Sequence, residues 1–283
     1  MQSRKLSFSF DDDSKTNFSS VQQADEPEVE CHRARSCVVG VPIDVIGWDE
    51  TIEKLSLWAR QRKSRTVCLC NVHVVMTANE DPELHAAIRQ TDLALPDGAP
   101  IAWSLRRSGH RNQSRISGPD VMWSCLQVAE LEEQVVSFYG DTDITLNRLR
   151  RSLLAAFPRL RIGVMISPPF RPLTPAEDEG FIKAINSSGT QTLFVGLGCP
   201  KQELWMFKHH GSVDAVMMGV GAAFAFHAGM TSRAPEWMRH SGLEWLHRLA
   251  MEPRRLAKRY LVTNSRFISA VAMESLKSIM RGR

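Results

Sequence analysis

The sequence of 283 residues contains no apolar run long enough to cross a membrane. Its longest uninterrupted apolar run, residues 215–226, falls short of the roughly 20 residues that a membrane-spanning helix requires. No positively charged start leads into an apolar segment, so we expect no secretory signal. The sequence therefore predicts a protein that is soluble or that lies on a membrane without crossing it.

Disulfide, metal and nucleotide-loop motifs are also absent. None of the six cysteines forms a C-x-x-C pair, so we expect the reduced, buried thiols of a cytosolic protein. The histidines lack the spacing of a metal site, and no G-x-G-x-x-G or G-x-x-x-x-G-K-[ST] loop occurs. We therefore expect that the protein requires neither a metal ion nor a cofactor.

The net charge of +4 is small and unevenly distributed. Residues 233–283 contain eleven Lys and Arg against four Asp and Glu, a net charge of +7, which leaves −3 for residues 1–232. A nucleic-acid-binding surface needs a concentrated basic face with stacking aromatics, yet the chain has only two tyrosines. We expect no nucleic-acid partner, but we do expect an anionic partner at the basic C-terminal segment.

The chain divides into three parts by composition. Residues 1–36 are polar and lack periodicity, which predicts a disordered arm. Residues 37–232 alternate short apolar runs with amphipathic stretches, a pattern typical of a doubly wound, mostly parallel, Rossmann-like α/β core. Residues 233–283 predict a helical appendage, with helices over 236–252 and 264–280. The strands expected in the core are 37–41, 66–71, 93–96, 135–139, 161–166, 192–196 and 215–219. The helices expected in the core are 49–62, 80–90, 119–130, 143–157, 175–187 and 201–210.

Most of the expected strands end on glycine or on a small polar residue. Ligands of open parallel sheets bind beyond the carboxyl ends of the strands. Glycine also ends strands in ordinary turns, but so many shared endings favour a pocket. Gly140 is one of the strand endings expected to line this pocket, and Gly196 and Gly198 would let a nucleotide approach the backbone closely.

Three charged residues near these strand ends could take part in chemistry. Asp97 follows an apolar strand and could act as a general base, although Pro-Asp-Gly is also a strong turn signal. Arg115 could bind phosphate through its planar guanidinium, or could be an ordinary surface arginine. Asp120 could line the same site, or could only interact with the dipole of the helix that it begins.

The residues Gln202 and Glu203 occupy the first turn of the helix expected after the sequence GLGCP. Free N–H groups at the start of a helix form a natural anion site.

The basic appendage could present a solvated face. It could instead bind phosphates through its arginines while Trp237 and Trp245 lie at a bilayer interface, and we favour this interpretation.

Several ordered motifs resemble one known family. They are LALPDGAP (93–100), RISGPDVMW (115–123), SFYGD (137–141), FVGLGCPKQELW (194–205), GVGAAFAFHAG (219–229), RAPEWMRHSGLEWLHRL (233–249) and EPRRLAKRY (252–260). In this order they are similar to the signature of the WecG/TagA/CpsF glycosyltransferases. The resemblance covers about residues 38–262. It implies inverting transfer of a hexose-type sugar from a UDP-sugar to a polyprenyl-diphosphate-linked acceptor at the cytoplasmic face of a bacterial membrane, and it suggests homo-oligomers.

The resemblance also implies roles for particular residues. Asp97 matches the proposed catalytic base of the family, and Asn71 matches the asparagine that ends the first pocket strand. Arg115 and Gln202 match polar residues of the active site. The appendage arginines thought to close over the site are matched by Arg248, Arg255 and, less closely, Lys258 or Arg259.

Two positions depart from the family pattern. Leu69 stands where the family usually has a threonine, and Ala225 stands where it often has an aspartate. The loss of a hydroxyl and a carboxylate makes an N-acetylmannosamine or N-acetylmannosaminuronate donor less secure and a plain glucose donor plausible, so the sequence leaves the donor sugar open. The same losses prompt an alternative, a non-catalytic regulator that binds a nucleotide sugar on the same fold.

Overall fold

The fold is built around a six-stranded, all-parallel β-sheet. The computed structural model of the protein describes residues 33–251 and 253–281. The strand order is β4-β3-β8-β7-β5-β6, so the chain crosses over the sheet repeatedly. The strands are β3 (Arg65–Cys70), β4 (Leu93–Pro96), β5 (Val135–Gly140), β6 (Arg161–Ile166), β7 (Thr192–Gly196) and β8 (Val216–Gly219).

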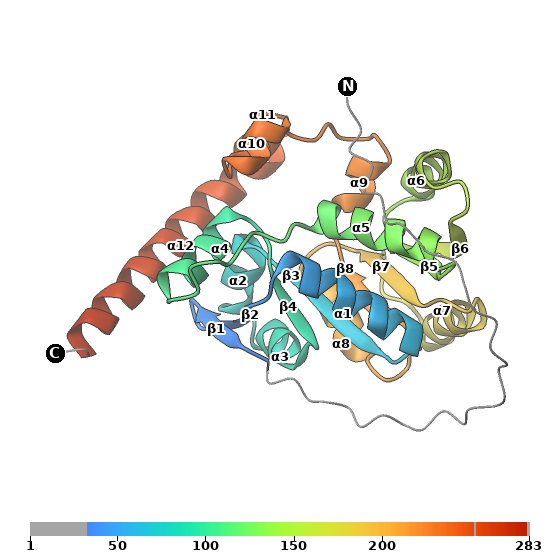
Figure 1. The fold of residues 1–283 in the computed structure, drawn as a ribbon, viewed down its shortest axis with the longest axis horizontal. Coiled ribbons are helices and arrows are strands. Elements are labelled where there is room, and N and C mark those ends of the chain that lie inside the picture. The colour runs from blue at the N-terminus through green and yellow to red at the C-terminus, as the bar shows by residue number, and fades with distance from the viewer. Residues whose placement is uncertain (1–32, 252, 282–283) are drawn as a thin grey trace, which may run out of the picture. The chain divides into compact units, whose positions relative to one another are not determined.

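Helices cover both faces of this sheet (Figure 1). Strands β4 and β8 are buried along their whole length, which explains why they are continuous apolar runs without alternation. One face packs against α1 (Trp48–Gln61), α5 (Gly118–Leu131), α6 (Asp143–Ala156) and α9 (Ala223–His227). The other packs against α2 (Val72–Ala78), α3 (Pro82–Gln90), α4 (Ala99–Arg107), α7 (Pro175–Ser187) and α8 (Lys201–Lys208). The predicted doubly wound α/β architecture is therefore confirmed.

The first expected strand, residues 37–41, is not part of the sheet. Instead, β1 (Arg35–Val38) and β2 (Val41–Asp44) form a separate antiparallel hairpin. The chain reverses at Val39 and Gly40, which have φ angles of 49° and 77°. Because Val39 is β-branched and positive φ is unusual for such a residue, the apolar pattern gave no sign of this turn.

The hairpin begins inside the segment predicted as a disordered arm. Arg33 donates to Asp44 at 2.9 Å, and Arg35 donates to the same carboxylate at 3.2 Å. The Asp44 side chain is only 3% exposed, so these two guanidinium groups neutralise a buried charge. They fix the chain from Arg33 onward, whereas residues 1–32 of the predicted arm lie outside the described residues.

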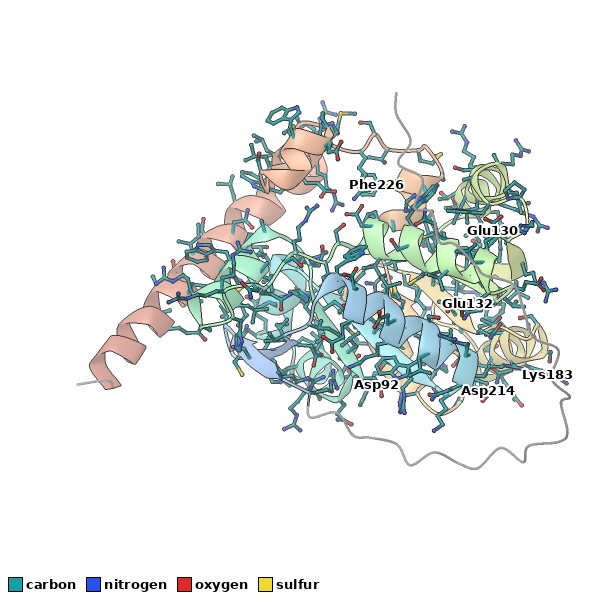
Figure 2. All side chains as sticks on the ribbon, in the orientation of Figure 1. Asp92, Glu130, Glu132, Lys183, Asp214 and Phe226 are labelled. Atoms are coloured by element: carbon teal, nitrogen blue, oxygen red, sulfur yellow. The ribbon has the colours of Figure 1, made fainter. Side chains whose placement is uncertain are left out.

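The two ends of the sheet differ in character. Asp92 and Asp214 lie at the amino ends of the strands, where Asp92 holds Arg65 by an ion pair of 3.3 Å (Figure 2). Phe226 lies beyond the carboxyl ends, near the C-terminal helices (Figure 2). The strand ends predicted to form the pocket are therefore at the end that the appendage approaches.

The described residues of the appendage form the helices α10 (Glu236–His240), α11 (Glu244–Met251) and α12 (Pro253–Arg281). Gly242, with a φ angle of 73°, separates the first two, so the single helix expected over 236–252 is wrong. Helix α12 packs against α2 (Figure 1), and its Phe267 is buried in the core beneath that helix. The helical nature of the C-terminal segment is confirmed.

Candidate active site

A cavity of about 1030 Å³ lies beyond the carboxyl ends of β3, β4, β7 and β8. We call it the main cavity. Residues of α11 and α12 complete its wall on the side of the appendage. The structure brings together in its lining seven of the residues singled out from the sequence. They are Asn71, Asp97, Arg115, Gly196, Gly198, Gln202 and Arg248.

Asp97 directly follows β4 and is held there by hydrogen bonds of its backbone N–H and of its side chain. Its N–H donates to the carbonyl of Cys70 at 3.2 Å. The side-chain amide of Asn71 donates to Asp97 Oδ2, also at 3.2 Å. Asn71 itself is fixed because its Oδ1 caps α2, accepting from the N–H groups of His73 and Val74. The carboxylate is therefore oriented by Asn71, which follows the adjacent strand β3 and caps α2.

The surroundings of Asp97 favour its protonated form more than water does. Burial raises the pKa of this carboxyl to about 6, and the negative charge of Glu244 acts in the same direction. The amide of Asn71 and the guanidinium groups of Arg115 and Arg248 oppose the increase in pKa. A carboxylate with a pKa near 6 is a stronger base than an ordinary aspartate and is still ionised at neutral pH.

Gln202 joins the two glycine loops beneath the main cavity. Its Oε1 accepts from the N–H of Gly198 at 3.2 Å and from the N–H of Gly221 at 3.1 Å. A Cβ at Gly219 would lie 3.1 Å from Gln202 Nε2 and 2.9 Å from the Met206 methyl group, so glycine there leaves room for this side chain. Gln202 is buried, and its hydrogen bonds fix the two glycine loops relative to each other.

Two residues expected in the site do not line the main cavity. The Glu203 side chain points into the protein and accepts from Gln202 Nε2 at 2.8 Å. Its burial raises the pKa of the carboxyl, and hydrogen bonds from Gln202 and Cys199 oppose this increase. Gly140 lies so close to β7 that a Cβ would be 2.5 Å from the Gly196 carbonyl oxygen. Gly140 therefore allows two strands to approach, and neither Gly140 nor Glu203 is in the lining of the main cavity.

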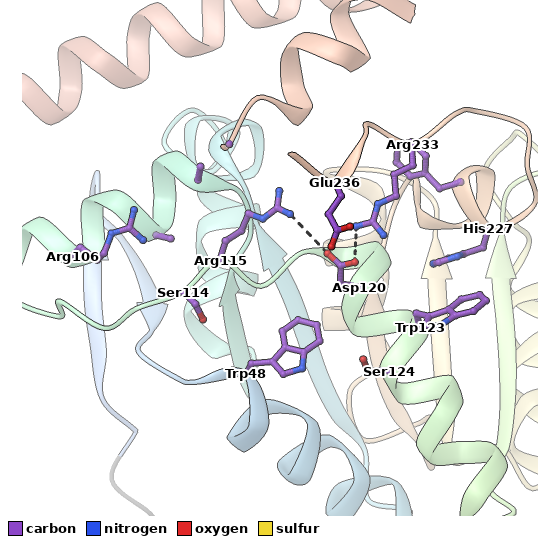
Figure 3. Close-up of a pocket in the computed structure, with 14 residues that line it drawn as sticks. Trp48, Arg106, Ser114, Arg115, Asp120, Trp123, Ser124, His227, Arg233 and Glu236 are labelled. Carbon is purple, nitrogen blue, oxygen red and sulfur yellow. Dashed lines mark ion pairs between the residues drawn. The ribbon is translucent and has the colours of Figure 1, made fainter. Parts of the chain in front are cut away.

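A second cavity of about 860 Å³, which we call the side cavity, adjoins the main cavity (Figure 3). Asp120 lines the side cavity and not the main one, and its expected part in substrate binding stays a prediction. Its carboxylate binds Arg233 at 2.7 Å and lies 3.9 Å from Arg115. Burial alone would raise the pKa of Asp120, but hydrogen bonds from Ser117 and Arg233 and the charge of Arg115 lower it overall.

Arg115 connects the core to the appendage. Its Nη1 donates to Glu244 Oε2 at 2.8 Å, and the Glu244 side chain is only 16% exposed. The neighbouring N–H of Ile116 donates to the carbonyl of Pro96 at 3.0 Å, which places Arg115 beside the end of β4. The guanidinium therefore lies on the boundary between the two cavities, which both include it in their lining.

The appendage contributes one expected arginine that the structure can place. Arg248 lines the main cavity, and its guanidinium lies 5.5 Å from the centre of the Phe226 ring. The side chains of Arg255, Lys258 and Arg259 lie outside the described residues, although their backbone belongs to α12. Their predicted role at a diphosphate remains a prediction.

Sequence reasoning missed several residues of these cavities. Glu244 and Arg233 belong to the appendage motif, but nothing local showed that they pair with Arg115 and Asp120. The proline-rich loop 168–173 also lines the main cavity, and its Phe170 is 84% exposed. An exposed aromatic residue between prolines beside a strand end is a signal that could have identified this loop.

Among residues 33–251 and 253–281, no group of three or more His, Cys, Asp or Glu side chains is placed to hold a metal ion. Within the same residues, every helix is too short or too polar to span a bilayer.

Comparison with known proteins agrees with the motifs. Residues 36–281 match the model of the family described as "Glycosyl transferase WecG/TagA/CpsF family". A curated relative from Staphylococcus aureus (strain MW2) is 25% identical over 234 residues, which is 82% of this chain and 90% of the relative. That protein is an N-acetylglucosaminyldiphosphoundecaprenol N-acetyl-beta-D-mannosaminyltransferase. The chain belongs to the WecG/TagA/CpsF family of glycosyltransferases.

Proposed function

We propose that the protein transfers a hexose-type sugar, with inversion, from a UDP-sugar to a polyprenyl-diphosphate-linked saccharide in cell-surface or exopolysaccharide synthesis. Its family supports the reaction class, and the name of the staphylococcal relative supports the acceptor class. One observation carries the proposal. It is the partly buried Asp97 carboxylate, held by Asn71 beside the guanidinium groups of Arg115 and Arg248 in a large cavity.

In this mechanism Asp97 acts as the general base. It removes the proton of the acceptor hydroxyl as that oxygen attacks the anomeric carbon of the donor. The new carbon–oxygen bond forms on the face opposite the diphosphate. The bond from the anomeric carbon to the diphosphate oxygen breaks at the same time, and UDP leaves with the electron pair. A single displacement of this kind inverts the anomeric configuration.

The departing diphosphate needs positive charge and close backbone contact. Arg115 and Arg248 supply guanidinium groups in the main cavity. Gly198 leaves the backbone uncovered there, whereas a Cβ at Gly196 would lie 2.7 Å from the Phe224 ring. Arg115 is already held in place by Glu244, so little reorganisation is needed when charge develops. Preorganised charge is usually the largest single contribution to such rate enhancements.

The donor sugar is proposed to be a neutral hexose without an N-acetyl group, such as glucose. Leu69 and Ala225 both line the main cavity, at the positions where the family often has a hydroxyl and a carboxylate. The Leu69 side chain lies against Gly118, where a Cβ would be only 2.9 Å away. An apolar wall here offers no partner for a charged or additional polar substituent, which favours glucose over an uronic acid or an N-acetyl sugar.

A donor panel tests this function. Wild-type enzyme is assayed with UDP-glucose, UDP-GlcNAc, UDP-ManNAc and a UDP-uronic acid, each with a short-chain prenyl diphosphate GlcNAc acceptor. We expect transfer from UDP-glucose to exceed that from the uronic acid by about 100-fold or more, because a buried unpaired charge is costly. Binding of a UDP-sugar without transfer from any donor would support the regulator alternative and contradict the proposal.

We also propose attachment to the cytoplasmic face of the membrane through the appendage. Trp237 on α10 is 63% exposed, and Trp245, Leu246 and Met251 on α11 are exposed as well. The same segment carries the net charge of +7 counted from the sequence. Exposed aromatic and aliphatic side chains beside basic residues are typical of a helix that lies in the interface of an anionic leaflet.

Substituting two exposed apolar residues tests the attachment. The double variant Trp237→Glu, Leu246→Glu is expected to bind vesicles of mixed neutral and anionic phospholipid about ten-fold or more weakly, because it removes apolar area and adds negative charge. Co-sedimentation measures the bound fraction. The control is Leu131→Glu, which changes a 73% exposed leucine at the C-terminal end of α5. Equal binding by the double variant and the control would contradict the attachment.

A further inference from the structure

Four charged side chains join the core to the appendage beside the active site. Arg115 and Asp120 belong to the core, and Arg233 and Glu244 belong to the appendage. Arg115 Nη1 lies 2.8 Å from Glu244 Oε2, and Arg233 Nη2 lies 2.7 Å from Asp120 Oδ1. Two longer contacts complete the set, from Arg115 to Asp120 at 3.9 Å and from Arg233 to Glu244 at 4.0 Å. We call these four side chains the charge ring.

Positive and negative charges alternate around the charge ring. Each arginine contacts both carboxylates, and Figure 3 shows Arg115 and Arg233 reaching Asp120 from two sides. The four side chains are between 16% and 30% exposed, so water screens these charges less than it screens an ion pair on the open surface. Removing one of the four charges would therefore leave a partly buried charge of the opposite sign without its balance.

Asp120 and Arg233 are themselves held in place. Asp120 lies in the first turn of α5, where the helix dipole favours a negative charge, and its Oδ2 accepts a hydrogen bond from Ser117. Arg233 is followed by Ala234, which is buried, so the chain is packed against the protein where it enters the appendage. The contact between Asp120 and Arg233 therefore joins two fixed points.

The other two members of the charge ring, Arg115 and Glu244, line the main cavity that contains Asp97. Burial contributes most to the raised pKa of Asp97, the charge of Glu244 raises it further, and the charge of Arg115 opposes the increase. Any movement of Arg115 or Glu244 away from its present place would therefore change the proton affinity of the proposed base.

We infer that Asp120 and Arg233 are positioning residues, which keep Arg115 and Glu244 paired beside Asp97 and so hold α11 at the active site. This inference rests on the proposed function. Without Asp120, Arg233 has Glu244 as its remaining partner in the charge ring and draws it away from Arg115. Without Arg233, Asp120 has Arg115 as its remaining partner and draws it away from Glu244.

The two losses act on Asp97 with opposite sign. In Asp120→Asn the carboxylate of Glu244 shifts towards Arg233, so the pKa of Asp97 falls and the acid limb of the pH–rate profile moves to lower pH. In Arg233→Gln the guanidinium of Arg115 shifts towards Asp120, so the pKa of Asp97 rises and the limb moves to higher pH. The double variant loses one charge of each sign and keeps the Arg115–Glu244 pair, so its limb stays in place.

The other charged and titratable groups around Asp97 are the same in all these variants. Arg248 of α11 also opposes the raised pKa of Asp97. Cys70 of β3, whose carbonyl accepts from the N–H of Asp97, has a thiol pKa raised well above its usual value by burial, so this thiol is neutral over the range assayed. Further titratable side chains in the lining of the main cavity are His73, Tyr139, Asp141, Arg171, Cys199 and Lys201.

A double-mutant cycle on kcat/KM for the acceptor, measured against pH, tests the inference. Each single variant is expected to lose about ten-fold at neutral pH, and the double variant also about ten-fold instead of the hundred-fold of independent sites. The acid limb is expected to move by about half a pH unit, down in Asp120→Asn and up in Arg233→Gln. Arg233→Lys keeps the positive charge and is expected to keep the wild-type limb.

The matched controls are Asp143→Asn, Arg150→Gln and their double variant, which make the same changes at exposed positions of α6. Thermal unfolding checks that every variant is folded. Additive losses in the double variant, or limbs that stay in place or move together in the two single variants, would overturn the inference.

Hydrogen–deuterium exchange gives a second measurement that needs no turnover. We expect the backbone amides of residues 244–251 to exchange about ten-fold faster in each single variant than in the controls, because α11 is held less firmly. Equal exchange in the single variants and the controls would contradict the inference. If wild-type protein transfers sugar from no donor, the proposed function fails, whereas the exchange rates still decide whether Asp120 and Arg233 hold α11.

Discussion

Asp97→Asn is expected to lower kcat for sugar transfer by about 10²- to 10⁴-fold, the range typical of losing a general base. The substitution keeps the size of the side chain and can still accept a hydrogen bond from Asn71, which now holds the carboxylate at 3.2 Å. It removes only the capacity to take a proton from the acceptor hydroxyl. Steady-state assays with the lipid-linked acceptor measure the loss.

Binding of UDP to Asp97→Asn is expected to stay close to that of the wild-type protein, because the arginines and glycine loops of the main cavity are unchanged. The matched control is Asp143→Asn, which changes an exposed aspartate at the start of α6 by the same atoms. If Asp97→Asn transferred sugar at a rate within a few-fold of the control, another group would have to be the base.

Glu244→Gln is expected to move the acid limb of the pH–rate profile to lower pH. Asp97 must be ionised to act as a base, and its pKa is raised to about 6 by burial and, in addition, by the charge of Glu244. The Glu244 carboxylate now lies 2.8 Å from Arg115 and offsets its positive charge. Once the carboxylate is removed, the charge of Arg115 favours the ionised form of Asp97 more strongly. Both changes lower the pKa of Asp97, so activity persists to lower pH.

The measurement is kcat/KM for the acceptor between about pH 4.5 and 8, since this quantity reports ionisations of the free enzyme. Glu179→Gln, at an exposed position on α7, changes the net charge equally and is the control. An acid limb that stays in place in Glu244→Gln, or that moves to higher pH, would show that Glu244 does not act on the base.

The sheet could be predicted from the sequence because parallel strands buried on both faces appear as continuous apolar runs. Runs such as 93–96 and 192–196 coincide with β4 and β7 in the structure. The place of Asp97 could also be predicted, since a carboxylate after a parallel strand must lie at the carboxyl edge of the sheet. Its electrostatic surroundings could not, because they come from Glu244 and Arg248, which are distant in sequence.

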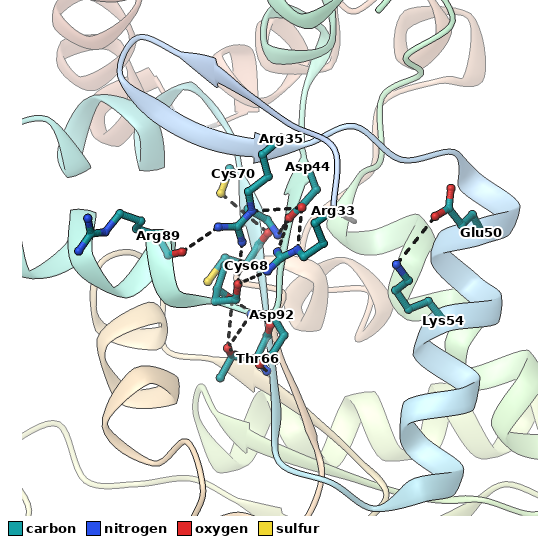
Figure 4. Close-up of polar contacts among 12 residues, drawn as sticks. Arg33, Arg35, Asp44, Glu50, Lys54, Thr66, Cys68, Cys70, Arg89 and Asp92 are labelled. Carbon is teal, nitrogen blue, oxygen red and sulfur yellow. Dashed lines mark hydrogen bonds and ion pairs between the residues drawn. The ribbon is translucent and has the colours of Figure 1, made fainter. Parts of the chain in front are cut away.

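Contacts between distant segments account for the other failures. Figure 4 shows Arg33 and Arg35 converging on Asp44, whose Oδ2 also accepts from the N–H of Ala94 at 2.5 Å. No local pattern marks Asp44 as buried, so the sequence could not show that residues 33–36 belong with the hairpin. The close contact of Gly140 with Gly196 on β7 could not be predicted for a similar reason, because the two residues are distant in sequence.

The identity of the base is the central claim, and one comparison tests it most directly. kcat/KM for the acceptor is measured against pH for wild-type protein and for the residual activity of Asp97→Asn. Wild-type activity should fall about ten-fold per pH unit below a midpoint near 6, and this limb should be absent from the variant. A wild-type profile that is flat down to pH 4.5, or a variant that keeps the same limb, would contradict the account.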